Sequence, residues 1–141
     1  MPNQQPNTST SGDDSRLISK TLILGASLKP KRYAYRAAEL LQQNGEPAVG
    51  LGLREGKVGE VPIFTEMKEV EKLGPFATVT LYLSPRNQKE YRKWVEELSP
   101  QRVIFNPGTE DPSWARTLED KGIQPIYACT LVMLRSGQYA L

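Results

Sequence analysis

The Gly-Ala-Ser segment at residues 25–27 has the residue types of a backbone anion-binding loop. It ends an apolar run over residues 21–25, and a helical pattern begins soon afterwards at residue 33. Backbone N–H groups at a helix start, together with the helix dipole, bind anions without any special side chain. The loop also carries three cations, Lys29, Lys31 and Arg32. The pattern predicts a site for a polyphosphate, with a solvated basic loop as the alternative for the cations.

The residue that follows the second apolar run bears on the type of nucleotide. A dinucleotide fingerprint needs G-x-G-x-x-G and an acidic residue about 20 positions later to hold a ribose hydroxyl. Only its first glycine, Gly25, is present, and the second run ends in Gly52-Leu53-Arg54. A basic residue there favours a phosphorylated ribose, as in NADP or coenzyme A. No Walker sequence occurs, so ATP hydrolysis is not expected.

The composition excludes several classes of chemistry. The chain of 141 residues contains no histidine, which removes histidine-based acid–base catalysis, histidine metal ligands and phosphohistidine. Its one cysteine, Cys129, cannot form an intramolecular disulfide. Apolar neighbours predict that this thiol is buried and structural, with a reactive thiol as the alternative. The net charge of +2 and a pI of about 8.7 are too mild for a nucleic-acid binder.

The N-terminal segment, residues 1–16, is nearly devoid of large apolar side chains and is expected to be a flexible tail. It lacks the pattern of a signal peptide, and no apolar run is long enough for a bilayer. A cytoplasmic protein without a membrane partner is therefore expected. Residues 17–141 have the length of one domain.

Apolar runs and helical patterns alternate along this domain. Strands are predicted over residues 21–25, 48–53, 61–64, 76–83, 102–105 and 125–128. Helices are predicted over residues 33–44, 66–73, 85–98, 112–121 and 130–135. This alternation predicts a Rossmann-like α/β fold, in which a doubly wound parallel sheet forms the middle of three layers, with strand order 3-2-1-4-5-6. Ligands of such sheets bind between the carboxyl ends of strands 1 and 4.

Four local features sharpen this prediction. Pro62 is expected to place the third strand at a sheet edge, after a charged, glycine-rich loop over residues 54–60. Glycine within the second strand indicates that a ligand or another backbone comes close. At Gly25 the close approach of a ligand is preferred over a simple turn. Thr65 and Ser84 are expected to cap the helices that follow them.

Five segments together resemble one known family. They are residues 24–27, 32–33, 80–83, 102–110 and 128–134, of which the Asn-Pro-Gly-Thr-Glu and Ala-Cys-Thr-Leu-Val-Met-Leu sequences are the most specific. They are similar to the small stand-alone CoA-binding domain family. Its members are Rossmann-like bacterial proteins related to the CoA-binding domain of the succinyl-CoA synthetase alpha subunit. The resemblance covers roughly residues 20–139.

The resemblance implies that CoA lies across the carboxyl ends of the strands. The pyrophosphate would contact Gly25, Ala26, Ser27 and Leu28, with the cations Lys29 and Arg32 beside them. The phosphorylated ribose would meet Arg54 and Lys57. The pantetheine would be flanked by Ser84, Pro85 and Arg86. The far end would be closed by Asn106, Pro107, Gly108, Thr109 and Glu110.

The predicted function is the binding of coenzyme A or an acyl-CoA, without evident catalysis. Glu110 and Asp111 could act as a catalytic carboxylate pair, but an acidic turn before Pro112 is preferred. The ligase activity of the related synthetases needs a phosphorylated histidine and a grasp domain, so it is not expected. Two alternatives stay open, an NADP-type oxidoreductase or sensor and a ligand-dependent interaction module. The expected partner is a small nucleotide ligand, and a homodimer or protein partner is left open.

Overall fold

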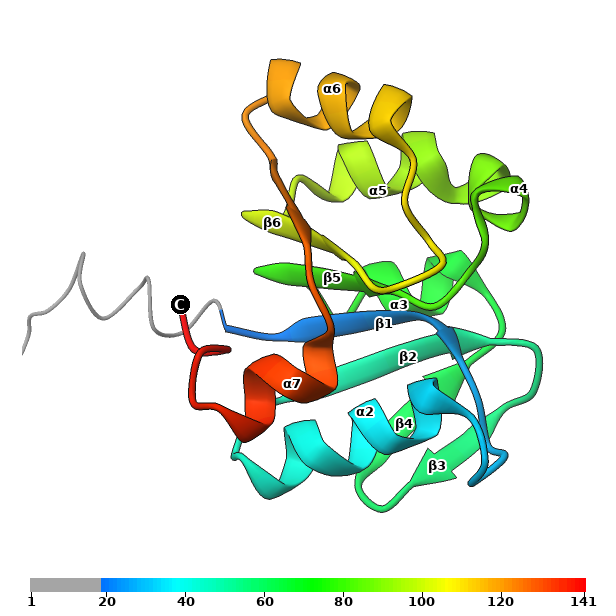
Figure 1. The fold of residues 1–141 in the computed structure, drawn as a ribbon. Helices are drawn as coiled ribbons and strands as arrows, with labels where there is room; N and C mark the ends of the chain where they lie inside the picture. The colour runs from blue at the N-terminus through cyan, green and yellow to red at the C-terminus, as the bar shows by residue number, and fades with distance from the viewer. Residues whose placement is uncertain (1–18) are drawn as a thin grey trace, which may run out of the picture.

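The computed structural model describes residues 19–141, so the predicted tail over residues 1–16 lies outside the described residues. The described strands are β1 (Thr21–Ala26), β2 (Ala48–Gly52), β3 (Gly56–Val58), β4 (Val61–Phe64), β5 (Thr78–Leu81), β6 (Arg102–Phe105) and β7 (Gln124–Tyr127). They form one sheet in the order β3-β4-β2-β1-β5-β6-β7 (Figure 1). All neighbours are parallel except β3 and β4. Without β3, this is the predicted strand order, which is confirmed.

Strand β3 corrects two predictions. The segment expected as a loop over residues 54–60 contains β3, which pairs antiparallel to β4 with Lys57 opposite Pro62. Strand β4 therefore does not lie at the edge of the sheet. The prediction of an edge position, made from Pro62, is wrong. Pro62 has a register partner in β3 but none in β2, because the ladder between β4 and β2 uses Ile63 and Phe64. The missing N–H of Pro62 therefore falls outside that ladder.

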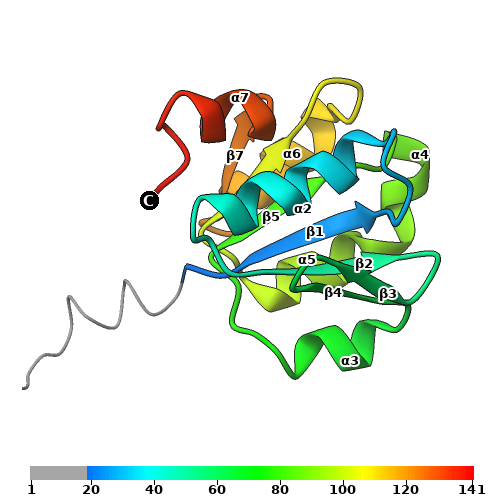
Figure 2. The ribbon, with the colours of Figure 1, turned by 90° about the horizontal axis from the view of Figure 1, so that it is seen from below.

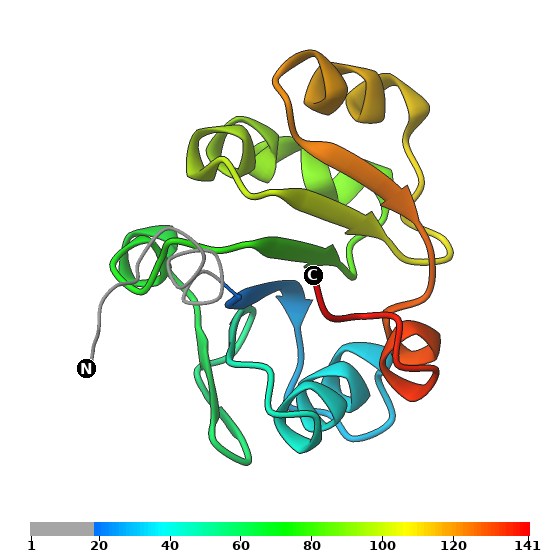
Figure 3. The ribbon, with the colours of Figure 1, turned by 90° about the vertical axis from the view of Figure 1, so that its left-hand side faces the viewer.

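Helices cover both faces of the sheet (Figures 2 and 3). Their bounds are α2 (Tyr33–Gln43), α3 (Met67–Glu71), α4 (Pro85–Gln88), the 3-10 turn η1 (Lys89–Tyr91), α5 (Arg92–Leu98), α6 (Pro112–Asp120) and α7 (Thr130–Arg135). Helices α2 and α7 lie on one face, and α3, α5 and α6 lie on the other. The single helix predicted over residues 85–98 is divided by η1. None of the helices within residues 19–141 combines the length and apolar character that a bilayer crossing requires.

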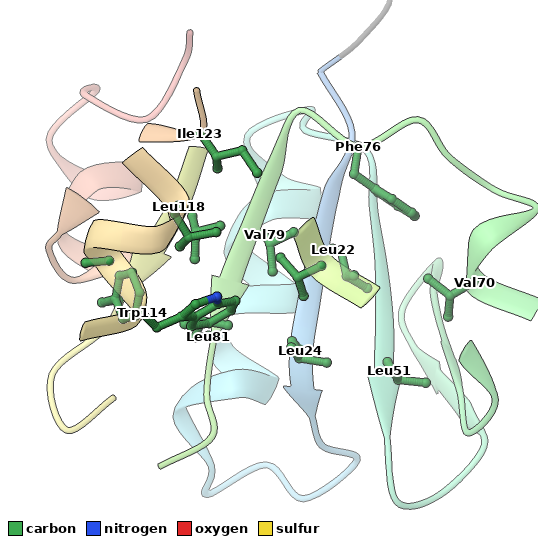
Figure 4. Packing of buried hydrophobic residues seen from close by; sticks show 14 of the residues in the cluster. Leu22, Leu24, Leu51, Val70, Phe76, Val79, Leu81, Trp114, Leu118 and Ile123 are labelled. Atoms are coloured by element: carbon green, nitrogen blue, oxygen red, sulfur yellow. The ribbon is translucent and has the colours of Figure 1, made fainter. Parts of the chain in front are cut away.

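The alternation of side chains along β1 builds a core on each face. Leu22 and Leu24 join the cluster under α3, α5 and α6, whereas Ile23 and Ala26 join the cluster under α2 and α7. Figure 4 shows part of the first cluster, in which Leu81 of β5 lies beside Trp114 of α6, and Leu51 of β2 lies on the side of Val70 of α3. The apolar stripe predicted along residues 91–98 packs against this cluster and is confirmed as core.

The amino ends of the strands are closed by the C-terminal segment. Arg102 is buried, and its Nε donates to the Thr78 hydroxyl at 2.9 Å. Its Nη2 donates to the backbone carbonyl of Tyr139 at 2.5 Å, and the guanidinium lies 4.6 Å from the centre of the Tyr139 ring. The Tyr139 hydroxyl bonds that of Thr21, the first residue of β1. These contacts fix the C-terminal segment at the end of the sheet opposite to the carboxyl ends of the strands.

Candidate functional site

A cleft of about 540 Å³ lies at the carboxyl ends of β1 and β5. The loop after β1 forms one wall, and the loop that leads into α4 forms another. The lining residues are Gly25, Ala26, Ser27, Lys29, Arg32, Tyr33, Ala34, Leu53, Tyr82, Leu83, Ser84, Asn87, Pro107, Gly108 and Thr109. The cleft thus occupies the point where the connections from β1 and β5 diverge, which is where open parallel sheets bind ligands.

Gly25 gives the first wall its shape. It forms a bulge in β1, where the register with β2 shifts between Leu24 and Ala26. Its φ is +95°, and a Cβ would lie 2.8 Å from the carbonyl oxygen of Tyr82. The neighbouring strand therefore requires glycine at this position, irrespective of any ligand. The close approach of a ligand to Gly25, which lines the cleft, stays a prediction.

Gly52 shows the second way in which the sheet fixes this wall. A Cβ on Gly52 would overlap the carbonyl oxygen of Ala26 in β1. The prediction that another backbone comes close to the glycines of the second strand is therefore confirmed here. Together, Gly25 and Gly52 allow the ends of β1, β2 and β5 to pack closely beneath the cleft.

The start of α2 provides anion-binding groups. Among the described residues no side chain caps this helix, and its first turn holds no acidic residue. In this first turn the N–H of Tyr35 donates to the Arg32 carbonyl at 3.1 Å, so the N–H groups of Tyr33 and Ala34 are the ones that can donate to an anion in the cleft. Lys29 and Arg32 are exposed on the same loop. The Ser27 hydroxyl accepts the N–H of Lys29 at 3.0 Å, which stabilises the turn between strand and helix.

Two large apolar side chains at the cleft are exposed to solvent. Tyr33 is 69% exposed and Leu53 is 96% exposed, and both line the cleft. The sequence did not single them out because apolar residues at the end of a strand or the start of a helix are normally assigned to the core. The one feature of the sequence that could have indicated an exposed Leu53 is its position directly before Arg54 in a turn. Exposed apolar groups on a concave surface are typical of ligand contacts.

The wall between β5 and α4 is held to the loop after β6. Ser84 occupies the N-cap position of α4, but its side chain makes no capping bond and is exposed at the cleft. The fully buried Gln88 donates through Nε2 to the carbonyls of Leu83 and Thr109, each at 2.7 Å. The two loops therefore meet through a single amide group.

Asn106 was predicted to contact the ligand, and the structure places it beneath the cleft. Its Nδ2 donates to the Thr80 hydroxyl at 2.7 Å and to the Leu81 carbonyl at 2.8 Å. Its Oδ1 accepts the N–H of Thr130 at 2.8 Å. The residue is only 3% exposed, so its side chain orients the loop that follows it. In that loop, the Thr109 hydroxyl donates to the Asn106 carbonyl at 2.7 Å.

Five further predicted residues lie outside the lining of the cleft. Leu28 packs beside Gly56, where a Cβ would lie 2.9 Å from the leucine Cδ1. Pro85 is the first residue of α4, and its carbonyl accepts a bond from Arg92 at 3.3 Å. The remaining three are exposed side chains, Arg54, Lys57 and Arg86. Their contact with a ligand stays a prediction.

The acidic pair after the cleft is engaged by the chain itself. The carboxylate of Asp111 caps α6 by accepting the N–H of Trp114 at 3.1 Å, and it pairs with Arg92 at 2.5 Å. The Trp114 N–H, together with Arg92, holds the pKa of Asp111 below its ordinary value. Glu110 accepts the N–H of Gly108 at 2.9 Å. This arrangement is the acidic turn that the sequence favours over a catalytic pair.

Cys129 is at the N-cap position of α7 and is partly exposed, which corrects the prediction that it is a buried side chain. Apolar flanks predicted burial, but the strand ends before this residue and the chain turns there at the protein surface.

Burial raises the pKa of Tyr82, whose backbone and ring lie between the cleft and the second core cluster.

One comparison with known proteins identifies a family. A family model described as a CoA binding domain matches residues 19–135. A solved protein described only as uncharacterized is 41% identical, with a TM-score of 0.77, and the match covers 86% of this chain and 98% of that one. The comparison with curated proteins gives no match.

More distant structures share the fold. A Thermus thermophilus protein described as cell-free ID.343 is 16% identical with a TM-score of 0.75, over 92% of this chain and 99% of its own. A hypothetical protein from Pyrococcus horikoshii OT3 is 19% identical with a TM-score of 0.71, over 96% and 98%. These two likenesses concern the fold alone. Because the family model matches most of its length, the chain belongs to the CoA binding domain family.

Proposed function

We propose that the protein binds coenzyme A or an acyl-CoA in the cleft at the carboxyl ends of β1 and β5, and that it acts by binding rather than by catalysis. The observation that carries the proposal is the composition of the cleft. An uncapped helix start and two cations lie on one wall, and exposed apolar side chains lie at the rim. A ligand with phosphates, a planar base and a flexible arm fits such a surface.

The nucleotide half is proposed to lie against the loop after β1. The pyrophosphate would accept N–H groups from the first turn of α2, with Lys29 and Arg32 neutralising its charge. The base would pack against Leu53 and Tyr33, removing their apolar surface from water. Arg54, which directly follows Leu53, would then be near the phosphorylated ribose, with Lys57 on β3 as a second cation.

The pantetheine arm is proposed to run towards the loops after β5 and β6. These loops contribute Leu83, Ser84, Asn87 and residues 107–109 to the cleft. The carboxylates next to this end are occupied in a cap, an ion pair and a loop hydrogen bond. They are therefore poor candidates for a free general acid or base, which supports binding without turnover.

Calorimetric titration with CoA, dephospho-CoA, NAD and NADP tests the proposal. CoA is expected to bind about tenfold or more tightly than dephospho-CoA, because a charge-assisted contact to phosphate contributes roughly 1.5–3 kcal/mol. Arg54→Ser is expected to reduce this preference. Arg116→Ser, which removes an exposed arginine from α6, is the matched control and should leave it unchanged.

Other outcomes would contradict the proposal in distinguishable ways. Equal affinity for CoA and dephospho-CoA would remove the assignment of the ribose phosphate to Arg54. A preference for NADP would favour the oxidoreductase or sensor. Hydrolysis or transfer of the acyl group from acetyl-CoA during incubation would show that the protein is an enzyme. Absence of binding to every nucleotide would overturn the proposal itself.

A further inference from the structure

We infer that Gln88 is a positioning residue that fixes the distance between the two walls at the pantetheine end of the cleft. The inference rests on the proposed function, because it concerns the shape of the proposed CoA site. Gln88 is the last residue of α4, is fully buried, and is not among the residues that line the cleft. Its effect on a ligand must therefore pass through the loops that it holds.

The geometry of one nitrogen atom links these loops. The Nε2 of Gln88 donates to the carbonyl of Leu83, before α4, and to the carbonyl of Thr109, before α6, at 2.7 Å in both cases. Leu83 and Thr109 each line the cleft. Because both acceptors are backbone atoms, the two bonds fix the loops themselves and not merely two side chains.

The oxygen atom of the Gln88 amide indicates which part of the side chain stabilises the fold. The Oε1 of Gln88 is buried and has no hydrogen-bond partner among residues 19–141. A buried acceptor without a partner destabilises a folded protein, and an apolar side chain of similar size would avoid that loss. The favourable contribution of Gln88 therefore resides in its two donated bonds. Its own N–H bonds the Ser84 carbonyl at 3.0 Å, so α4 holds the amide in place.

A second connection lies farther from the cleft. Arg92 donates to the Pro85 carbonyl at 3.3 Å and pairs with Asp111 at 2.5 Å, so it also joins the segments around α4 and α6. Removing the Gln88 bonds should thus leave the loops near each other but free to move. We expect such a variant to fold. It should contact the pantetheine arm of CoA less well and bind the nucleotide half as the wild type does.

The variant Gln88→Met tests this directly, because it keeps the size of the side chain and removes both donated bonds. Calorimetry would compare CoA with adenosine 3′,5′-bisphosphate, which is the nucleotide half without the second phosphate of the pyrophosphate. CoA affinity is expected to fall about tenfold, and affinity for the bisphosphate is expected to change less than about twofold. Val95→Ala, a buried substitution on α5, is the control for lost stability and should change neither affinity.

A second variant keeps the test independent of folding defects in the first. In Gln88→Glu a protonated carboxyl can donate one bond to a loop carbonyl, whereas the ionised form can donate none. The affinity of this variant for CoA, relative to wild type at the same pH, is expected to rise as the pH is lowered from about 8 to about 6. A ratio that does not change with pH, or equal losses for CoA and the bisphosphate, would overturn the inference.

Failure of the proposed function can be separated from failure of this inference. If wild-type protein binds neither CoA nor the bisphosphate, the proposed function is wrong. Hydrogen exchange of the ligand-free protein then still reports on Gln88, since the N–H of Asn87 in α4 donates to the Ser84 carbonyl and that of Thr109 donates to the Asn106 carbonyl. Faster exchange at both in Gln88→Met, but not in Val95→Ala, is the expected result. Unchanged exchange would show that Gln88 does not hold the loops.

Discussion

The carbonyl oxygen of Tyr82 occupies the space that a side chain on Gly25 would need, because a Cβ there would lie only 2.8 Å away. Gly25→Ala is therefore expected to destabilise the fold. Backbone strain at a φ of +95° costs about 1–3 kcal/mol, and the contact with the strand adds to it. Urea unfolding measures the loss.

Gly122 provides the control for this substitution. It also has a positive φ, +79°, but no atom lies within 4 Å of the place that a Cβ would occupy. Gly122→Ala should therefore show the strain without the steric contact, and its loss of stability should be the smaller of the two. Equal losses would mean that the backbone at Tyr82, directly after β5, yields and that only the backbone conformation of the glycine matters.

Leu53→Ser is expected to weaken CoA binding without lowering stability. The side chain is 96% exposed, so the fold gains little from it, whereas a bound base would cover it. A loss of roughly 1 kcal/mol in binding, about fivefold in Kd, is expected from the apolar contact. Val132→Ser changes a 57% exposed residue on α7, away from the cleft, and should leave Kd unchanged. Wild-type affinity in Leu53→Ser would show that the base lies elsewhere.

Asp111→Asn is expected to flatten the acid side of the stability profile. The Trp114 N–H and Arg92 lower the pKa of Asp111 in the folded protein, so the carboxylate stabilises the fold above its ordinary pKa of 3.8. That contribution is lost as the pH falls through the lowered folded value. Urea midpoints between about pH 6 and pH 2 should therefore fall less in Asp111→Asn than in wild type. Asp120→Asn, at the end of α6, is the control, and identical profiles for Asp111→Asn and wild type would contradict the assignment.

Cys129→Ser is expected to keep CoA affinity within about threefold of wild type, because the thiol is not among the residues that line the cleft. Its partial exposure predicts labelling of the native protein by a thiol reagent, a reaction that a fully buried residue would resist. Calorimetry and mass spectrometry measure the two effects. Protection of Cys129 by CoA, or a disulfide between them, would place the thiol end of the ligand at α7.

The strand order was predictable because six short segments rich in apolar residues alternate with helical patterns. Strand β3 was not predictable, since its three residues are short, glycine-containing and partly charged, and its partner β4 contains a proline. Only the tertiary pairing of Lys57 with Pro62 defines it. The division of the predicted helix at η1 likewise has no signal in the apolar stripe, which begins only at Tyr91, the last residue of η1.

The site was predictable to the level of its loops. The carboxyl ends of parallel strands must meet at one edge, so residues 25–29 and 107–109 could be brought together from topology alone. The contacts of individual side chains were harder to predict. Asn106 has the residue type of a ligand contact but serves three bonds within the chain, and Gln88 has no motif at all. Hydrogen bonds of this kind depend on the distance between loops, which a sequence does not encode locally.

The contacts of Tyr139 with Arg102 and Thr21 have a consequence for how such a protein can diversify. They anchor the C-terminus at one end of the sheet, whereas the cleft lies at the other end, at the carboxyl ends of the strands. Substitutions that alter ligand choice therefore need not disturb the anchor, and selection can act on specificity and on foldability through separate sets of residues. A fusion attached after Leu141 would likewise extend from the end of the molecule that is remote from the cleft.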